Sequence, residues 1–247
     1  MFDLSNRTAL VTGAGRGVGA GIARALAAQG ALVIVNDYFE DRAHDMATVI
    51  CDAGGRAESV AFDASDRVTV ASRVSDVVNR VGGIDILVAN VGTLPNGQGV
   101  KHFLDMEPEE WPSHIDNNLY STLNCIHAVA PAMVRQGWGR LIAIASDAGR
   151  VGSVGSSIYG AAKAGVIGLM RSLGKELGPH GVTTNSIALG LIDTVPPEFA
   201  KGAASHYAVG RIGTPADVAA ACVYLSSEEA GWMSGQCLVL NGASHGG

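Results

Sequence analysis

The chain has 247 residues, of which 47% are hydrophobic and 16% charged, and its net charge is −6. This composition is typical of a compact soluble domain and excludes a disordered or fibrous chain. The negative charge argues against nucleic acid or an anionic membrane as a partner, because proteins that bind either carry a basic surface.

The sequence shows no secretory leader and no apolar run of about 18 residues. We therefore expect a cytoplasmic protein without a membrane span. The four cysteines have no C-x-x-C spacing and no cluster with histidine at metal-ligand spacing. They are expected to be free, buried thiols, and no metal site is expected.

Short apolar runs alternate with segments of helical periodicity along the chain. The runs predict strands at 8–11, 31–35, 57–62, 84–89, 139–145, 182–188 and 236–240. The periodic segments predict helices at 22–28, 41–53, 66–81, 108–119, 122–136, 161–177 and 215–225. This alternation predicts an α/β fold, a doubly wound parallel sheet with helices on both faces. We expect one domain over 1–247, with the weakly periodic segment 192–213 as a lid over the substrate.

A glycine-rich turn separates the first expected strand from the first expected helix. Residues 12–19 read Thr-Gly-Ala-Gly-Arg-Gly-Val-Gly. Such a turn lets backbone N–H groups and a helix N-terminus approach a pyrophosphate. Asp37 ends the second strand, where a carboxylate can accept from both ribose hydroxyls of an adenosine. The alternatives are a packing turn and an acid that caps a helix.

Tyr159 and Lys163 stand four residues apart and share one face of an expected helix. A free tyrosine titrates near about 10, and a neighbouring cation lowers that pKa toward the range useful for acid–base catalysis. Ser146 follows a strand, at the sheet edge where ligands bind in open α/β folds. The alternatives are a surface pair on a helix and a serine that caps a loop.

These motifs together resemble the short-chain dehydrogenase/reductase family. Residues 12–19 resemble T-G-x-x-x-G-x-G, residues 89–92 resemble N-N-A-G, and residues 185–190 resemble N-x-I-x-P-G. Asn118, Ser146, Tyr159 and Lys163 match the family's catalytic tetrad in order and spacing. Two positions depart from the pattern, because Leu189 replaces a proline and Ala243 follows Gly242 where the family has a glycine pair.

The resemblance implies a single-domain Rossmann fold and hydride transfer between a nicotinamide cofactor and a carbonyl or carbinol carbon. Tyr159 would exchange the proton on oxygen, and Lys163 would lower the Tyr159 pKa and hold the nicotinamide ribose. Ser146 would bind the substrate oxygen, and Asn118 would anchor a water. The implied cofactor contacts are Gly13, Arg16, Gly17, Val18, Gly19, Asp37, Asp63, Ala64, Asn90, Gly92, Tyr159, Lys163, Gly190, Ile192 and Thr194.

We expect NAD rather than NADP, because Asp37 would occupy the place of the 2′-phosphate, although Arg16 could receive that phosphate. The expected reaction interconverts a secondary alcohol and a ketone. The substrate would be a hydroxyacyl-CoA or an alicyclic hydroxy compound, since residues 145–153 resemble those of relatives acting on hydroxycycloalkane-carboxyl-CoA thioesters. Small residues at Ala148, Gly149 and Gly152, and at Gly92, Thr93 and Gly190, would leave room. On the lid, Phe199 and Tyr207 could cover an apolar body, and Arg150, Lys201 or His206 could meet an anionic group at the mouth.

Three alternatives stay open at this point. The enzyme could be a 3-oxoacyl reductase or a hydroxysteroid dehydrogenase of the same family, or the chain could be a non-catalytic dinucleotide-binding sensor. Asp147 and Arg150 could also pair with each other and carry no information about the substrate. The resemblance further implies a homotetramer, or a homodimer, formed through the helix around 161–178.

Overall fold

The computed structural model describes residues 1–92, 101–195 and 200–245. Its parallel sheet has the order β3-β2-β1-β4-β5-β6-β7. The strands are β1 Thr8–Val11, β2 Leu32–Asp37, β3 Arg56–Ala61, β4 Ile86–Ala89, β5 Gly139–Ser146, β6 Val182–Leu189 and β7 Cys237–Leu240. The helices are α1 Gly17–Ala28, α2 Glu40–Asp52, α3 Arg67–Val81, α4 Trp111–Ile115, α5 Ser121–Gln136, α6 Ser157–Leu177 and α8 Pro215–Ser226.

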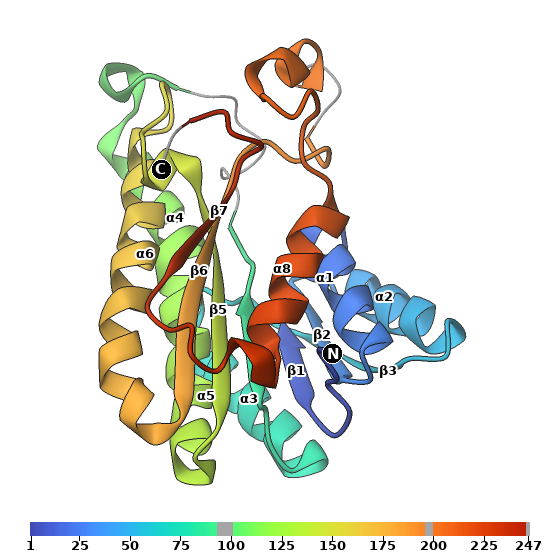
Figure 1. Ribbon diagram of the computed structural model, residues 1–247. Helices are drawn as coiled ribbons and strands as arrows, with labels where there is room; N and C mark the ends of the chain where they lie inside the picture. The colour runs from blue at the N-terminus through green and yellow to red at the C-terminus, as the bar shows by residue number, and fades with distance from the viewer. Residues whose placement is uncertain (93–100, 196–199, 246–247) are drawn as a thin grey trace.

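Helices cover both faces of this sheet, which confirms the predicted doubly wound α/β fold. Figure 1 shows α1, α2 and α8 on one side of the strands and α3, α5 and α6 on the other. Each side has its own apolar core, one around Ile22, Val35 and Val218 and the other around Leu87, Met133 and Met170. The central strand β4 is apolar throughout because both of its faces are covered.

Two helices begin earlier than the sequence predicts. The first was expected from residue 22, but α1 starts at Gly17, inside the glycine turn. The helix expected from residue 161 starts at Ser157 and so includes Tyr159. The apolar periodicity marks only the part of a helix that packs on the core, and the first turns of α1 and α6 lie at the sheet edge instead.

The two helical segments expected at 108–119 and 122–136 form one run. A π-helical turn over Asp116–Tyr120 joins α4 to α5. Such turns are rare and are frequent at functional sites. Asn118, a member of the predicted tetrad, lies inside this turn and is fully buried.

The carboxyl ends of the parallel strands meet at one edge of the sheet. Asp37, Ala89, Ser146 and Leu189 are the last residues of β2, β4, β5 and β6. The predicted lid segment starts at the same edge, because Ile192 and Gly213 form a parallel bridge that joins its two ends. Residues 196–199, and with them Phe199, lie outside the described part of the chain, as does Thr93. The lid stays a prediction.

Among the described residues, no helix combines the length and apolarity needed to cross a membrane. The described cysteines are free, as expected, but they are not all buried. Cys125 and Cys222 are buried, whereas Cys51 is exposed near the end of α2 and Cys237 is partly exposed on β7, the edge strand. The expectation of uniformly buried thiols was therefore wrong for these two positions.

Candidate active site

The glycine turn between β1 and α1 has the shape of a cradle that side chains would fill. Gly13 and Gly17 have φ angles of 60° and 57°, which glycine adopts without strain. A Cβ built on Gly19 would collide with the Gly13 carbonyl oxygen and lie 2.6 Å from Asn90 Nδ2. Because α1 starts at Gly17, its unpaired N–H groups face this turn. These residues fit the pyrophosphate of a dinucleotide.

Asp37 is fixed at the end of β2 by two backbone donors. Its Oδ2 accepts from the N–H of Gly15 and its Oδ1 from the N–H of Phe39, both at 3.1 Å. A Cβ on Gly15 would lie 2.8 Å from Asp37 Oδ2. The glycine at position 15 thus holds the carboxylate against the turn. Arg16, the cation that could favour NADP, is exposed at the N-cap of α1.

Thr12 and Asn90 stabilise the glycine turn through hydrogen bonds. The Thr12 Oγ1 accepts from the N–H groups of Asn90 and Val91, and Asn90 Nδ2 donates to the carbonyl oxygens of Thr12 and Gly13. The side-chain amide of Asn90 therefore holds the backbone of the glycine turn in place. Thr12 was not among the expected site residues, although it is the first residue of the glycine motif and could have been predicted from it.

Of the other expected cofactor residues, some lie near the glycine turn and others lie in the loop after β3. Thr194 reaches the turn, because its Cγ2 lies 3.4 Å from a Cβ built on Gly17, and Ile192 is buried beside it in the chain. Asp63 Oδ1 accepts from the N–H and the hydroxyl of Ser65, and the carbonyl of the buried Ala64 accepts from Asn124. Val18 packs against the apolar core, which leaves its backbone for any contact with a ligand.

Ser146 and Tyr159 come together at the end of β5. The Ser146 hydroxyl bonds to the Tyr159 side chain and also accepts from the N–H of Ala148 at 3.2 Å. Burial raises the pKa of Tyr159 above its ordinary value, and the hydrogen bond to Ser146 opposes that rise only partly. The phenol is therefore protonated at neutral pH and ready to donate. The expectation that the Tyr159 pKa would be lowered was wrong for the chain alone.

Lys163 explains that difference. Its side chain is 2% exposed, and its Nζ donates to the carbonyl of Ile144 at 2.9 Å and lies 5.9 Å from the centre of the Tyr159 ring. Desolvation lowers the pKa of Lys163 to about 8. At this distance, the Lys163 cation lowers the pKa of Tyr159 by less than burial raises it.

Asn118 and Lys163 meet across Gly92. A Cβ on Gly92 would touch Lys163 Nζ and lie 2.8 Å from Asn118 Oδ1. Asn118 Nδ2 donates to the carbonyl of His114 at 2.9 Å, one turn earlier in the chain. The structure thus brings Asn118, Lys163, Tyr159 and Ser146 to one place, although they come from three different elements.

The substrate side differs from expectation at three positions. Arg150 Nη1 pairs with Asp147 Oδ1 at 2.9 Å, which confirms the alternative that these two residues bind each other. The missing side chain of Gly149 faces the backbone of α6, since a Cβ there would lie 2.6 Å from the Ala164 nitrogen. Gly149 therefore permits close packing and does not widen the substrate space. Tyr207 uses its hydroxyl to accept from the N–H of Leu191 at 2.8 Å.

Gly190 lies between Tyr207 and the end of β7. A Cβ built there would lie 3.1 Å from both Tyr207 Cε1 and Asn241 Cα. The glycine is required by this close packing. Its predicted contact with a cofactor stays a prediction. Leu189, which replaces the family's proline, completes β6 as a buried residue.

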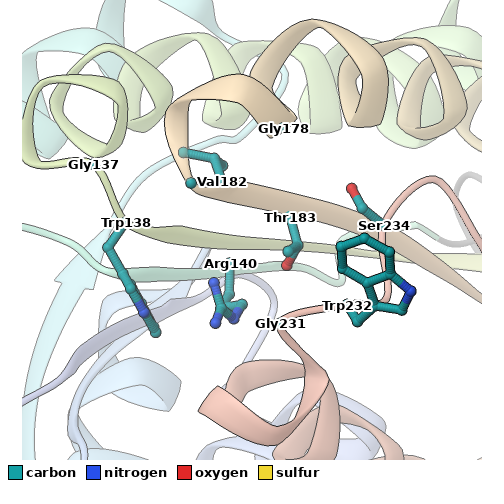
Figure 2. A pocket seen from close by; sticks show the side chains of 10 residues that line it. Gly137, Trp138, Arg140, Gly178, Val182, Thr183, Gly231, Trp232 and Ser234 are labelled. Carbon is teal, nitrogen blue, oxygen red and sulfur yellow. The ribbon is translucent and has the colours of Figure 1, made fainter.

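A separate hollow lies at the opposite edge of the sheet. Figure 2 shows Trp138, Arg140, Thr183 and Trp232 around it, a set without any tetrad residue. Its volume is about 410 Å³. The Arg140 guanidinium is engaged in hydrogen bonds within the protein, because Nε and Nη1 donate to the Ser227 and Gly139 carbonyls. Within the described ranges, no group of three His, Cys, Asp or Glu residues could hold a metal ion.

Comparisons with known proteins agree with this geometry. The family model described as enoyl-(acyl carrier protein) reductase matches residues 13–245. The chain belongs to the short-chain dehydrogenase/reductase family. It is 39% identical to the short-chain reductase protein NovJ of Streptomyces niveus, over 95% of this chain and 92% of that relative.

Two further relatives cover nearly the whole chain. The 3-oxoacyl-[acyl-carrier-protein] reductase FabG of Vibrio cholerae is 33% identical over 99% of each protein. A 7α-hydroxysteroid dehydrogenase solved with NADH and 7-oxo glycochenodeoxycholic acid superposes with a TM-score of 0.91, at 31% identity, over 98% of this chain and 95% of its own. As a member of this family, the protein is an oxidoreductase that acts on a secondary alcohol or a ketone.

Proposed function

We propose that the protein is an NAD(H)-dependent enzyme that interconverts a ketone and a secondary alcohol on a bulky acyl or alicyclic substrate. The assembly of Asn118, Ser146, Tyr159 and Lys163 at one sheet edge carries this proposal. A bound reduced nicotinamide supplies a hydride for the carbonyl carbon. Side chains of this protein orient the substrate, give a proton to its oxygen and recover that proton.

Ser146 accounts for the orientation of the substrate. Its hydroxyl is fixed by the Ala148 N–H and shared with Tyr159, so it can donate to the carbonyl oxygen of a ketone beside the phenol. Tyr159 then gives its proton to that oxygen as negative charge develops there. In the oxidative direction, the same phenolate removes the proton from the alcohol.

Lys163 and Asn118 account for recovery of the proton. Lys163 is charged at neutral pH, because its lowered pKa of about 8 still lies above 7. The ammonium stabilises the phenolate left on Tyr159, and Asn118, which approaches Lys163 next to Gly92, would anchor the water that returns a proton. Gly13, Gly17, Gly19 and Asp37 would hold the pyrophosphate and the adenosine ribose.

The choice of NAD over NADP depends on Asp37. Its carboxylate is held by Gly15 at the strand end, where it would accept from ribose hydroxyls and repel a 2′-phosphate. We expect Asp37→Ser to lower kcat/KM with NADH by roughly tenfold, because a hydrogen bond to a charged group contributes about 1.5–3 kcal/mol. The same change should raise kcat/KM with NADPH.

The matched control is Asp41→Ser, which removes an exposed charge from the first turn of α2 without touching Gly15. Steady-state kinetics with both cofactors, on the parent and the two variants, provide the measurement. A parent protein that works better with NADPH than with NADH would refute the assignment.

The substrate proposal draws on the relatives and on the site. FabG is named for 3-oxoacyl-[acyl-carrier-protein], and the hydroxysteroid dehydrogenase is solved with a steroid, so both carry a ketone or alcohol on a large apolar body. Here Ala148 and Gly152 follow Ser146 in the same loop, and nothing lies within 4 Å of a Cβ built on Gly152, so a 3-oxoacyl thioester or an alicyclic ketone could lie beside them.

We expect acetoacetyl-CoA and the bicyclic ketone decalone each to exceed acetone in kcat/KM by at least about tenfold, since each buried methylene is worth about 0.8 kcal/mol. NADH oxidation at 340 nm measures the three rates. If acetone is reduced fastest, the large-pocket proposal is wrong. If none of the ketones and none of the matching alcohols supports turnover, the non-catalytic sensor becomes the better explanation.

We also propose a cytoplasmic homotetramer assembled through α6, with a homodimer as the alternative. Gly168 on this helix has no neighbouring atom within 4 Å of a built Cβ, so a second copy could approach closely there. Sedimentation equilibrium would give the mass, and a monomer of 25.3 kDa would contradict the proposal.

A further inference from the structure

Asp147 is a buried carboxylate that the proposed chemistry does not use. It follows Ser146 directly and is 7% exposed. Its Oδ1 accepts from Arg150 Nη1 at 2.9 Å, and its Oδ2 accepts from Asn241 Nδ2 at 2.7 Å. A carboxylate removed from water needs such partners, and charge-assisted hydrogen bonds of this length are strong. The two partners tie Asp147 to its own loop and to the far end of the sequence.

The bond between Asp147 and Asn241 crosses a whole strand. Ser146 pairs with Leu189 on β6, and Leu189 pairs with Leu240 on β7. The ends of β5 and β7 are therefore about 9–10 Å apart, two strand spacings. Asn241 can lean across β6 because residue 190 is a glycine, whose absent Cβ would lie 3.2 Å from Asn241 Cβ.

The turn that carries Asn241 also holds the predicted lid segment. Asn241 Oδ1 accepts from the N–H of Ala243, and Asn241 Nδ2 also donates to the carbonyl of His245, so these bonds close a turn over residues 241–245. The carbonyl of Gly242 in this turn accepts from the N–H of Val209 at 3.3 Å. A Cβ on Gly242 would meet Val209 and Tyr207, so the turn and the segment 207–209 are in close contact.

Asp147 also shapes the loop that presents Ser146. The Asp147 carbonyl accepts from the N–H groups of Arg150 and Val151, both at 2.9 Å. The Ser146 hydroxyl accepts from the next amide in the same loop, that of Ala148. The hydrogen bond between Asp147 and Asn241 thus connects the loop that presents Ser146 to the turn that contacts segment 207–209.

We propose that Asp147 and Asn241 form a positioning pair that sets the orientation of Ser146 and of the segment 207–209 toward the substrate, without contributing to cofactor binding. This inference rests on the proposed role of Ser146. Sequence reasoning missed the pair, because the two residues are 94 positions apart and Asp147 was considered only as a partner of Arg150. The only signal was that each directly follows a strand.

The decisive variant is Asn241→Asp, which replaces the donor by a second carboxylate and forces like charges together. We expect kcat/KM for acetoacetyl-CoA to fall on the order of tenfold to a hundredfold, the effect of a misplaced reacting group. The fall should appear mainly in kcat, while the dissociation constant of NADH changes less than about twofold, within the scatter of surface substitutions. The double variant Asp147→Asn with Asn241→Asp exchanges donor and acceptor and should recover most of the lost rate.

Asp76→Asn serves as the control, because it removes an exposed carboxylate from α3. Asn241→Ala removes the donor without adding charge and keeps the test usable if Asn241→Asp does not fold. The same direction with a smaller loss is expected for it. Equal kcat/KM in Asn241→Ala, Asn241→Asp and the parent would overturn the proposal, as would a double variant no better than Asn241→Asp.

Hydrogen exchange provides a readout that needs no turnover. In Asn241→Asp and Asn241→Ala, amides in residues 147–151 and 207–210 should exchange at least about fivefold faster, because local opening becomes easier. The double variant should restore their protection, and the strands β1 and β4 should not change. If no ketone is reduced by the parent, the proposed function fails while exchange still decides the pair. Unchanged exchange in both segments would overturn it.

Discussion

Replacing Tyr159 by phenylalanine is expected to reduce kcat by about 10²–10⁴-fold, the usual contribution of a general acid or base. The change removes one hydroxyl from a half-buried ring and leaves the packing of α6 intact. The proton donor to the carbonyl oxygen is lost, and the hydroxyl of Ser146 loses a hydrogen-bond partner. Stopped-flow or steady-state oxidation of NADH gives the rate.

Cofactor affinity should survive this change. The glycine turn and Asp37 lie on β1, α1 and β2, away from the phenol, so the dissociation constant of NADH should stay within about threefold of the parent value, as expected for distant sites. Fluorescence titration measures it. A phenylalanine variant whose kcat is within threefold of the parent would assign the proton transfer to another group.

Replacing Lys163 by methionine is expected to remove turnover and at the same time to make the protein more stable. At pH 7 the folded chain holds a buried ammonium whose pKa has dropped to about 8 from an ordinary value of 10.5. The unfolded chain carries this charge in water at no such cost. The depressed pKa corresponds to a penalty of up to about 3 kcal/mol below pH 8, since one pKa unit is 1.36 kcal/mol.

Methionine has a similar length and no charge, so this penalty disappears. The hydrogen bond to the Ile144 carbonyl is lost as well, which costs about 1 kcal/mol. We expect the free energy of unfolding at pH 7 to rise by about 1–2 kcal/mol, while NADH binding weakens because the predicted contact with the nicotinamide ribose is lost.

The pH dependence gives the sign of this effect. Between pH 8 and 10.5 the unfolded parent chain binds the Lys163 proton more tightly than the folded chain, so this group raises the stability of the parent as pH increases. The advantage of the methionine variant should therefore shrink from pH 7 to pH 9.5 in urea unfolding. Lys175→Met, at an exposed position on the same helix, is the control. A variant less stable than the parent at pH 7 would refute the explanation.

The sequence predicted the framework because its signals are local. The apolar run at residues 8–11, the glycines that follow and the carboxylate at Asp37 each report a backbone requirement within a few positions. The tetrad was also predictable, since Tyr159 and Lys163 are one helical turn apart and Ser146 ends a strand. The π-helical turn around Asn118 gave no signal, because its extra residue depends on packing between α4, α5 and α6.

The remaining differences come from contacts that are distant in sequence. The pKa of Tyr159 depends on how far the folded chain buries its phenol, and no sequence motif reports that burial. Gly149 was expected to widen the substrate space, but its neighbour is the backbone of α6, fifteen residues later in the chain. The bond between Asp147 and Asn241 requires the strand order β5-β6-β7, which only the folded sheet supplies.

The bridge between Ile192 and Gly213 has a consequence for evolution and for protein engineering. It fixes both ends of the intervening segment on the sheet edge, independently of what the segment contains. Closing a flexible loop costs little more as the loop grows, about 0.6 kcal/mol for each doubling of its length. We therefore expect that the segment can be exchanged or extended without altering the half of the protein that contains the glycine turn.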